Sequence, residues 1–211
     1  MVTGRVYGPP GRQVEILDRD RVYDAFFKLD VLNLRHERFD GSWTPVLRRE
    51  LFVQRPAVVV LPYDAMQDLV VLVEQFRAGC IDRDEPPWLV EAVAGLVEEG
   101  ETPEAVAVRE TREETGLELG RLEFACRYHA SPGGTSERAH VFVGEIVAPS
   151  DGGMFGVAHE GEDIRTHIVP ATTAFAMVDD GRIVAANGVI PLLWLRANRE
   201  RLRREWQRAA V

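Results

Sequence analysis

The chain has little cysteine and no long apolar run. Its 211 residues include two cysteines, Cys80 and Cys126, which stand far apart in the sequence. Two isolated thiols do not form the spacing of a disulfide framework or a zinc site, and this favours a reducing compartment. No window approaches the roughly 18 consecutive apolar residues that a membrane span needs, and no signal peptide is recognisable. We therefore expect a cytoplasmic protein without disulfides and without a membrane partner.

Positive charge is also in short supply. The chain has 25 lysines and arginines against 34 acidic residues, which gives a formal net charge of −9. Such a charge disfavours nonspecific binding of nucleic acid or of membranes. The five histidines show no metal-binding spacing. An anionic small ligand would have to be held by a metal ion or by local arginines, for which Arg49, Arg77 and Arg138 are candidates.

The apolar pattern predicts an α+β protein in two parts. Residues 21–38 alternate as strands do, Asp40-Gly41 predicts a hairpin turn, and residues 43–52 provide the partner strand. Residues 1–54 are thus expected to form a small antiparallel β unit, and residues 55–211 a larger domain. The larger domain is expected to contain a long loop around residues 152–156, strands at 57–62, 69–75, 88–94, 122–129 and 139–147, and helices at 103–115, 172–179 and 191–208.

The segment 95–117 carries most of the chemistry. Thr102 suits a helix N-cap, Pro103 the first helical position, and Gly116 a left-handed stop, so a helix is predicted between them. Within it, three carboxylates at i, i+3 and i+4 share one face, namely Glu110, Glu113 and Glu114. The opposite face is expected to pack inward through Ala105, Val108, Thr111 and Thr115.

Three like charges on one face favour a bound cation, and carboxylate oxygens suit Mg²⁺ or Mn²⁺. Arg109 is able to pair with Glu101 or Glu113 and so to orient a ligand. For E-x-x-E-E alone, a solvated acidic helix is the competing interpretation. The longer frame G-x5-E-x7-R-E-x-x-E-E-x-G has seven fixed identities and should arise by accident with odds on the order of one in a million.

This frame is the Nudix box, and the chain resembles Nudix hydrolases, which cleave a nucleoside diphosphate linked to another moiety. The family form ends R-E-U-x-E-E-x-G-U, where U is aliphatic; Leu117 fits the last U, whereas Thr111 departs from the first. Residues 87–95, a proline fifteen residues after Leu117, and residues 160–164 resemble the ADP-ribose pyrophosphatase branch. The resemblance covers roughly residues 22–208 and implies the Nudix fold, in which helices sandwich a mixed β-sheet as an α/β/α arrangement.

The resemblance also implies the reaction, which is metal-dependent hydrolysis of ADP-ribose to AMP and ribose 5-phosphate. Mg²⁺ is the expected cofactor, with Mn²⁺ able to take its place. A carboxylate on a loop that closes over substrate would suit the general base, so Glu160 is expected in that role and Glu162 is the runner-up. The alternative is that both are ordinary loop acids. The implied metal ligands are the carbonyl of Ala94 and the side chains of Glu110, Glu113 and Glu114, with Glu162 as a possible ligand of a further metal.

Substrate contacts are implied by position against the family. Phe26 or Phe27 would stack on adenine, although plain packing is the alternative. Gln54 stands where relatives carry an arginine, which leaves the preferred substrate open. The full set comprises Phe26, Phe27, Arg49, Glu50, Arg77, Glu91, Leu96, Ser131, Gly133 and Glu137. The expected partner is a small nucleotide sugar, and the resemblance implies a homodimer with exchanged N-terminal strands.

Two other functions compete with this interpretation. One is hydrolysis of a different nucleoside diphosphate sugar, such as another ADP-sugar or GDP-mannose. The other is a non-catalytic Nudix-like sensor, which should show eroded box carboxylates and an added partner domain. Glu110, Glu113 and Glu114 all persist, which favours an enzyme.

Overall fold

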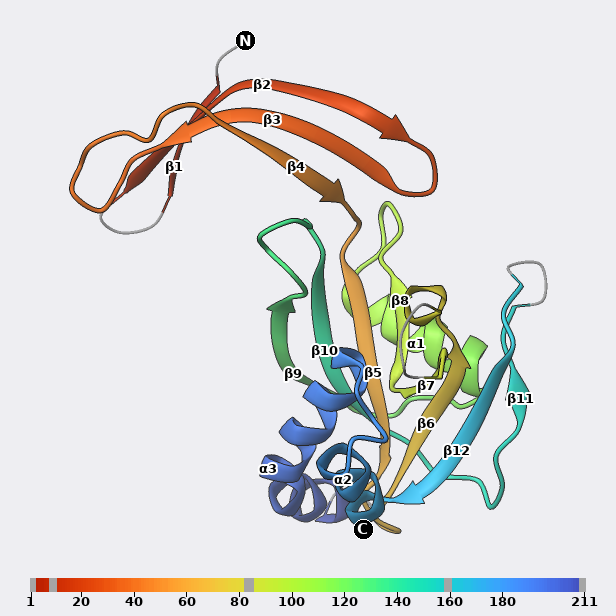
Figure 1. Cartoon of the computed structure of the whole chain (residues 1–211). Helices are drawn as coiled ribbons and strands as arrows, with labels where there is room; N and C mark the ends of the chain where they lie inside the picture. Colours follow the sequence, from red (N-terminus) through yellow and green to blue (C-terminus); the bar gives the residue numbers. More distant parts are fainter. Residues whose placement is uncertain (1–2, 8–10, 82–85, 158–160, 209–211) are drawn as a thin grey trace. The chain divides into compact units, whose positions relative to one another are not determined.

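The computed structural model describes residues 3–7, 11–81, 86–157 and 161–208. The chain divides into two compact units (Figure 1). Unit 1 comprises Met1–Arg55 and His129–Arg138, and unit 2 comprises Pro56–Tyr128 and Ala139–Val211. No helix in the described part of the chain combines the length and the hydropathy of a membrane span.

Unit 1 contains a four-stranded antiparallel sheet in the order β1-β2-β3-β4. The strands are β1 (Thr3–Tyr7), β2 (Arg12–Asp24), β3 (Lys28–His36) and β4 (Leu47–Val53). The expectation of a single strand over residues 21–38 is wrong, because the chain reverses at residues 25–27 and β2 pairs with β3. Ala25 N donates to Phe27 O at 3.0 Å in this turn. The turn contains neither glycine nor proline, so its sequence carries no signal of a reversal.

The hairpin turn at Asp40-Gly41 lies between β3 and β4 as predicted. Gly41 has φ 82°, a left-handed conformation that glycine adopts without strain. Ser42 N donates to Asp40 Oδ1 at 2.9 Å, which closes the turn through a side chain.

Unit 2 is built on an eight-stranded mixed sheet. The strand order is β11-β12-β6-β5-β10-β9, with β7 paired to β6 and β8 paired to β5. β10 runs parallel to β5, whereas β5 and β6 are antiparallel. The strands are β5 (Ala57–Asp64), β6 (Leu69–Phe76), β7 (Trp88–Glu91), β8 (Val93–Leu96), β9 (Leu122–His129), β10 (Arg138–Glu145), β11 (Met154–Phe155) and β12 (Ile164–Pro170).

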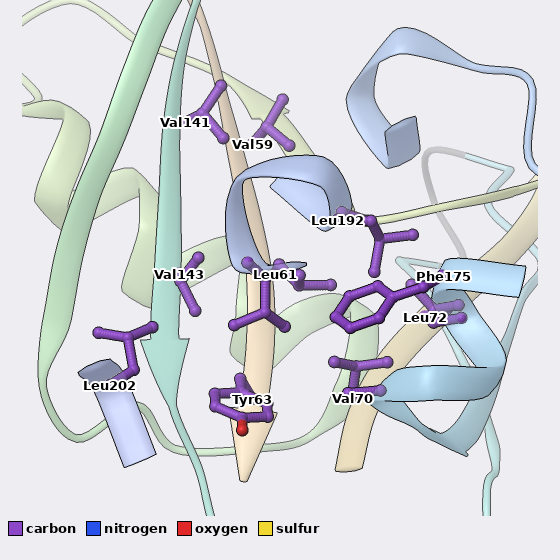
Figure 2. Packing of buried hydrophobic residues seen from close by; sticks show 14 of the residues in the cluster. Val59, Leu61, Tyr63, Val70, Leu72, Val141, Val143, Phe175, Leu192 and Leu202 are labelled. Carbon is purple, nitrogen blue, oxygen red and sulfur yellow. The ribbon is translucent and has the colours of Figure 1, made fainter. Parts of the chain in front are cut away.

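Helices cover both faces of this sheet, as the α/β/α prediction requires. The helices are α1 (Pro103–Thr115), α2 (Ala171–Asp179) and α3 (Ala186–Arg208), with a short η1 (Ala78–Cys80). Alternate residues of β5 divide between two cores: Val59, Leu61 and Tyr63 pack with α2 and α3, and Val58 and Val60 pack with α1. Figure 2 shows the first core, where β5 side chains meet Phe175, Leu192 and Leu202.

Three element predictions need correction. The strand expected at 88–94 is two strands, because the chain passes from pairing with β6 to pairing with β5. β12 was not expected, and β11 lies inside the predicted loop. The last helix begins at Ala186 and includes Pro191, where the loss of one backbone hydrogen bond is offset by complete burial of Leu192 and Leu195.

Candidate metal and pyrophosphate site

The acidic helix α1 has the ends that the sequence predicts. Thr102 Oγ1 accepts a hydrogen bond from Ala105 N at 3.2 Å, and Gly116 ends the helix with φ 70°. Its buried face matches the prediction at Thr111 and Thr115 and differs at Ala105 and Val108, which are exposed. The buried residues are Val106, Ala107, Thr111, Glu114 and Thr115. The helix is therefore rotated so that part of its carboxylate row, rather than a purely apolar row, faces β8.

Thr111, the departure from the family pattern, is fully buried. Its Oγ1 donates to Ala107 O at 2.8 Å, one turn back in the same helix. A hydroxyl satisfied in this way is tolerated where an aliphatic side chain is usual. The departure is therefore accommodated within α1.

Gly95 allows Glu110 to approach the backbone of β8. A Cβ atom at position 95 would lie 1.8 Å from Glu110 Oε1 and 1.9 Å from its Cδ. Real Cβ atoms never come so close, so the first glycine of the frame has a steric reason. The sequence alone marks this glycine but does not reveal what approaches it.

Glu114 and Glu110 are carboxylates held away from water. Glu114 is 2% exposed, and its Oε2 accepts a long hydrogen bond of 3.3 Å from Ala94 N. Burial, followed by the charge of Glu110, raises the pKa of Glu114 well above its ordinary value. Burial also raises the pKa of Glu110 to about 7, against the opposing effect of Arg109. Two desolvated acids side by side form a site that a cation would stabilise.

Arg109 connects the acids of this helix. Its Nε donates to Glu101 Oε1 at 3.0 Å, and its Nη1 donates to Glu110 Oε1 at 2.7 Å and to Glu113 Oε2 at 3.0 Å. Nη2 lies 3.4 Å from the carbonyl oxygen of Leu96. The hydrogen bond to Glu101 is the largest cause of a raised pKa for this guanidinium. Arg109 thus binds both partners that the spacing suggested, Glu101 and Glu113, and it also binds Glu110.

Glu162 lies close enough to raise the pKa of both Glu110 and Glu114 by its charge. Its Oε2 accepts from Val157 N at 3.0 Å. Glu160, the expected base, falls in residues 158–160, which lie outside the described residues. Its role stays a prediction.

The donor set fits a hard divalent cation. Carboxylate oxygens are the ligands that Mg²⁺ and Mn²⁺ prefer, and a bound cation would favour the ionised form of both acids. No three acidic, histidine or cysteine side chains within the described residues are yet arranged as a ligand group. Glu110 is turned toward Arg109 and Glu114 toward Ala94 N, so both would have to reorient to bind a metal.

Arg77 and Glu91, predicted separately as substrate contacts, bind each other. Arg77 Nη2 lies 2.6 Å and Nε 3.0 Å from Glu91 Oε2. Glu91 is 3% exposed, so this carboxylate depends on the arginine for its charge balance.

Apart from Leu96, which ends β8 in unit 2, the other predicted substrate contacts belong to unit 1. Phe26 is 78% exposed, and the ring centroids of Phe27 and Phe52 lie 4.9 Å apart. Arg49 is exposed, and its Nη1 donates to the carbonyl oxygen of Arg48. The guanidinium of Arg48 pairs with Glu50 at 2.6 Å. The segment 129–138 supplies the remaining members, Ser131, Gly133 and Glu137, of which Gly133 has open space at its Cβ position.

The mixed sheet of unit 2 carries helices on both faces, and its acidic helix α1 approaches Gly95 of β8. This arrangement is typical of Nudix proteins. The chain belongs to this family: residues 53–186 match the NUDIX domain. It is 46% identical over 193 residues to the ADP-ribose pyrophosphatase of Escherichia coli (strain K12), covering 92% of each chain. It is 34% identical over 186 residues to a GDP-mannose pyrophosphatase of Citrobacter koseri, covering 86% of this chain and 95% of the relative.

A solved structure described as an ADP compounds hydrolase has a similar fold. The TM-score is 0.67 at 21% identity, and the match covers 90% of this chain and 94% of that one. This likeness concerns the fold alone. Nudix ADP-ribose pyrophosphatases generally depend on a divalent metal.

Proposed function

We propose that the protein hydrolyses the pyrophosphate of ADP-ribose to AMP and ribose 5-phosphate. The observation that carries this proposal is the pair of buried carboxylates, Glu110 and Glu114, which lie against Gly95 and Ala94. The similarity to an ADP-ribose pyrophosphatase over nearly the whole chain supports the choice of substrate.

Mg²⁺ is the proposed cofactor, with Mn²⁺ able to take its place. Glu110, Glu114 and the carbonyl of Ala94 would hold it, with Glu113 assisting directly or through water. When bound, the metal would neutralise charge on the phosphate oxygens and lower the pKa of bound water. Arg109 would keep the carboxylates oriented, braced by Glu101.

A carboxylate near the site would take the proton of the attacking water. We assign this role to Glu160 and make Glu162 the second candidate, which is also a possible ligand of a further metal. The position of Glu162 near Glu110 and Glu114 supports its membership of the site.

Arg77 would bind a phosphate oxygen, because a guanidinium offers several donors to a planar or tetrahedral anion. The residues in unit 1 would contact adenine and ribose in a homodimer that exchanges its N-terminal strands. The exposed aromatic rings of unit 1, including Phe26, support a covering partner. Sedimentation of the full chain tests the dimer, which should have twice the mass of one chain.

A cytoplasmic location stays a prediction.

A second candidate is hydrolysis of another nucleoside diphosphate sugar. The similarity to a GDP-mannose pyrophosphatase favours keeping this alternative, and Gln54 marks one place where substrate contacts would differ. A non-catalytic sensor is the third candidate, and the retained carboxylates disfavour it.

One assay separates the three candidates. The purified protein is incubated with Mg²⁺ and, separately, ADP-ribose, other ADP-sugars and GDP-mannose, and the products are identified. Release of AMP mainly from ADP-ribose supports the proposal, release of GMP from GDP-mannose supports the second candidate, and binding without products supports the sensor. Glu114→Gln should lose turnover, whereas Glu118→Gln, at an exposed position just after the helix, should retain it.

A further inference from the structure

The Nε2 atom of Gln75 is a buried polar atom that has no hydrogen-bond partner within the described residues. Gln75 lies near the end of β6, and the residue is 8% exposed. A buried amide N–H without an acceptor costs free energy and is uncommon in folded proteins. When one persists, it often belongs to a functional site.

Gln75 lies on the face of the sheet that carries the acidic helix. Side chains alternate along a strand, so Val73 and Gln75 point to the same face. Arg77 continues in an extended conformation, with φ −124° and ψ 104°, and therefore shares that face. Val73 packs with Val106 and Ala107 of α1, which identifies the face.

The side chains of Arg77 and Glu91 reach toward each other along the sheet, and Gln75 lies between their positions in the register. In the register of β6 with β7, Glu91 lies opposite Val73, and Leu89 lies opposite Gln75. Arg77 follows the last residue of β6 and lies four residues beyond Val73, a distance of roughly 13 Å. Because the guanidinium and the carboxylate are nevertheless 2.6 Å apart, their charged ends meet between these levels, next to Gln75.

This arrangement explains why Nε2 lacks a partner. A guanidinium carries five donors and no acceptor, so Arg77 covers Gln75 without being able to satisfy it. Glu91 carries a carboxylate acceptor on the same face, and among the described residues it accepts hydrogen bonds from Nε and Nη2 of Arg77.

We propose that Gln75 is a positioning residue that replaces Arg77 at the carboxylate of Glu91. This inference rests on the proposed function, in which Arg77 binds a phosphate of the substrate. In the free protein Arg77 occupies Glu91, and Gln75 Nε2 has no acceptor. When Arg77 turns to the pyrophosphate, Nε2 donates to the carboxylate oxygen that Arg77 has left.

The exchange keeps a buried carboxylate hydrogen-bonded throughout. Without it, the departure of Arg77 would leave Glu91 buried and uncompensated, which is a strongly destabilising arrangement. The free protein holds an unsatisfied donor, and that donor becomes satisfied only in the loaded state. Gln75 thereby favours the conformation in which Arg77 is available to substrate.

Two isosteric variants give the first test. Gln75→Met keeps the length of the side chain and removes the unsatisfied donor, so the free protein should melt at the same temperature as wild type or higher. Gln207→Met is the matched control, because Gln207 Nε2 already donates to Ala65 O at 2.9 Å, and its loss should lower the melting temperature. With Mg²⁺ and the α,β-methylene analogue of ADP-ribose, Gln75→Met should raise the Kd about tenfold. In turnover it should raise KM with little change in kcat. Free-state destabilisation with unchanged Kd would mean an ordinary core residue and overturn the proposal.

The second test identifies the acceptor. The side-chain amide protons of Gln75 are followed by NMR on ¹⁵N-labelled protein and assigned by their loss in Gln75→Met. They should move downfield and exchange more slowly when the methylene analogue binds with Mg²⁺. They should not change with Mg²⁺ alone, and the change should be smaller in Glu91→Gln.

Each other outcome overturns the exchange. A full response to Mg²⁺ alone would mean that the acceptor arrives with the metal, and an undiminished response in Glu91→Gln would mean that the substrate itself is the acceptor. An unchanged signal with the analogue bound contradicts this inference while leaving the proposed function intact. A wild-type protein that neither binds the analogue nor releases AMP contradicts both.

Discussion

Replacing Glu110 with glutamine should stabilise the metal-free protein at alkaline pH. Burial raises the pKa of Glu110 from its ordinary value of 4.5 to about 7. A tenfold change in a proton equilibrium is worth about 1.4 kcal/mol, so ionising Glu110 in the fold costs roughly 3 kcal/mol. Glutamine resembles the protonated acid and avoids this cost. At pH 8 in EDTA, Glu110→Gln should raise the free energy of unfolding by up to about 3 kcal/mol.

The pH dependence fixes the sign of this effect. The unfolded chain loses the proton of Glu110 near pH 4.5, whereas the folded protein keeps it until about pH 7. Between these values the unfolded state binds fewer protons, so the stability of the wild type falls as the pH rises. Below pH 4 the acid is protonated in both states, and the variant should match the wild type. Urea unfolding followed by tryptophan fluorescence from pH 4 to pH 9 measures this difference.

Magnesium should reverse the order of stability. A cation that binds the ionised carboxylates stabilises the wild type by an amount that grows with the logarithm of its concentration above the dissociation constant, whereas Glu110→Gln should gain little. Glu118→Gln, with a side chain that is 71% exposed in the wild type, is the control and should follow the wild type in every condition. If Glu110→Gln proved less stable than wild type at pH 8 in EDTA, burial would not destabilise the ionised carboxylate, and α1 would not need a cation.

Two further predictions concern the acidic helix, and a third concerns the sheet of unit 1. Gly95→Ala should weaken the stabilisation by Mg²⁺ and lower kcat/KM about tenfold, because its Cβ would move the carboxylate of Glu110 away from β8. Calorimetry and steady-state kinetics measure the two effects, and metal binding at wild-type affinity would contradict the prediction. Arg109→Lys should lower kcat more than tenfold, because an ammonium cannot donate to three carboxylates at once as the guanidinium does. Its circular dichroism spectrum should match that of the wild type. Unchanged turnover would exclude an orienting role for Arg109. Asp30→Asn should remove an acid-sensitive part of the stability, because hydrogen bonding from Arg21 holds the pKa of Asp30 at about 2. The contribution of the ionised Asp30 to the free energy of unfolding is present above the ordinary pKa of 3.8 and is lost as the pH falls toward 2. If the variant lost stability in acid as steeply as the wild type, this prediction would be wrong.

The sequence predicted best where local chemistry decides the structure. The ends of α1 are confirmed because Thr102, Pro103 and Gly116 act on their own backbone neighbours. The hairpin at Asp40-Gly41 is confirmed for the same reason. The turn at residues 25–27 was missed because it carries no residue of special conformation, and strand alternation continues on both sides of it.

The orientation of α1 could not be predicted from the sequence. Periodicity assigned Ala105 and Val108 to the core, whereas packing on β8 buries Glu114 and half-buries Glu110. A hydrophobic pattern assumes that carboxylates face water, and a functional site is where that assumption fails. The pair formed by Arg77 and Glu91 depends on β7 lying next to β6, which is a nonlocal contact that spacing does not encode.

The two faces of the sheet in unit 2 differ in how completely their polar groups are satisfied. The face beneath α2 and α3 is a continuous apolar core, where the buried hydroxyl of Tyr63 is bound by Asp68. The α1 face holds two desolvated acids and the unsatisfied amide of Gln75. Evolution tolerates such costs where ligand binding repays them. This asymmetry favours a site on the α1 face, and it predicts that a ligand bound there will raise the free energy of unfolding of unit 2.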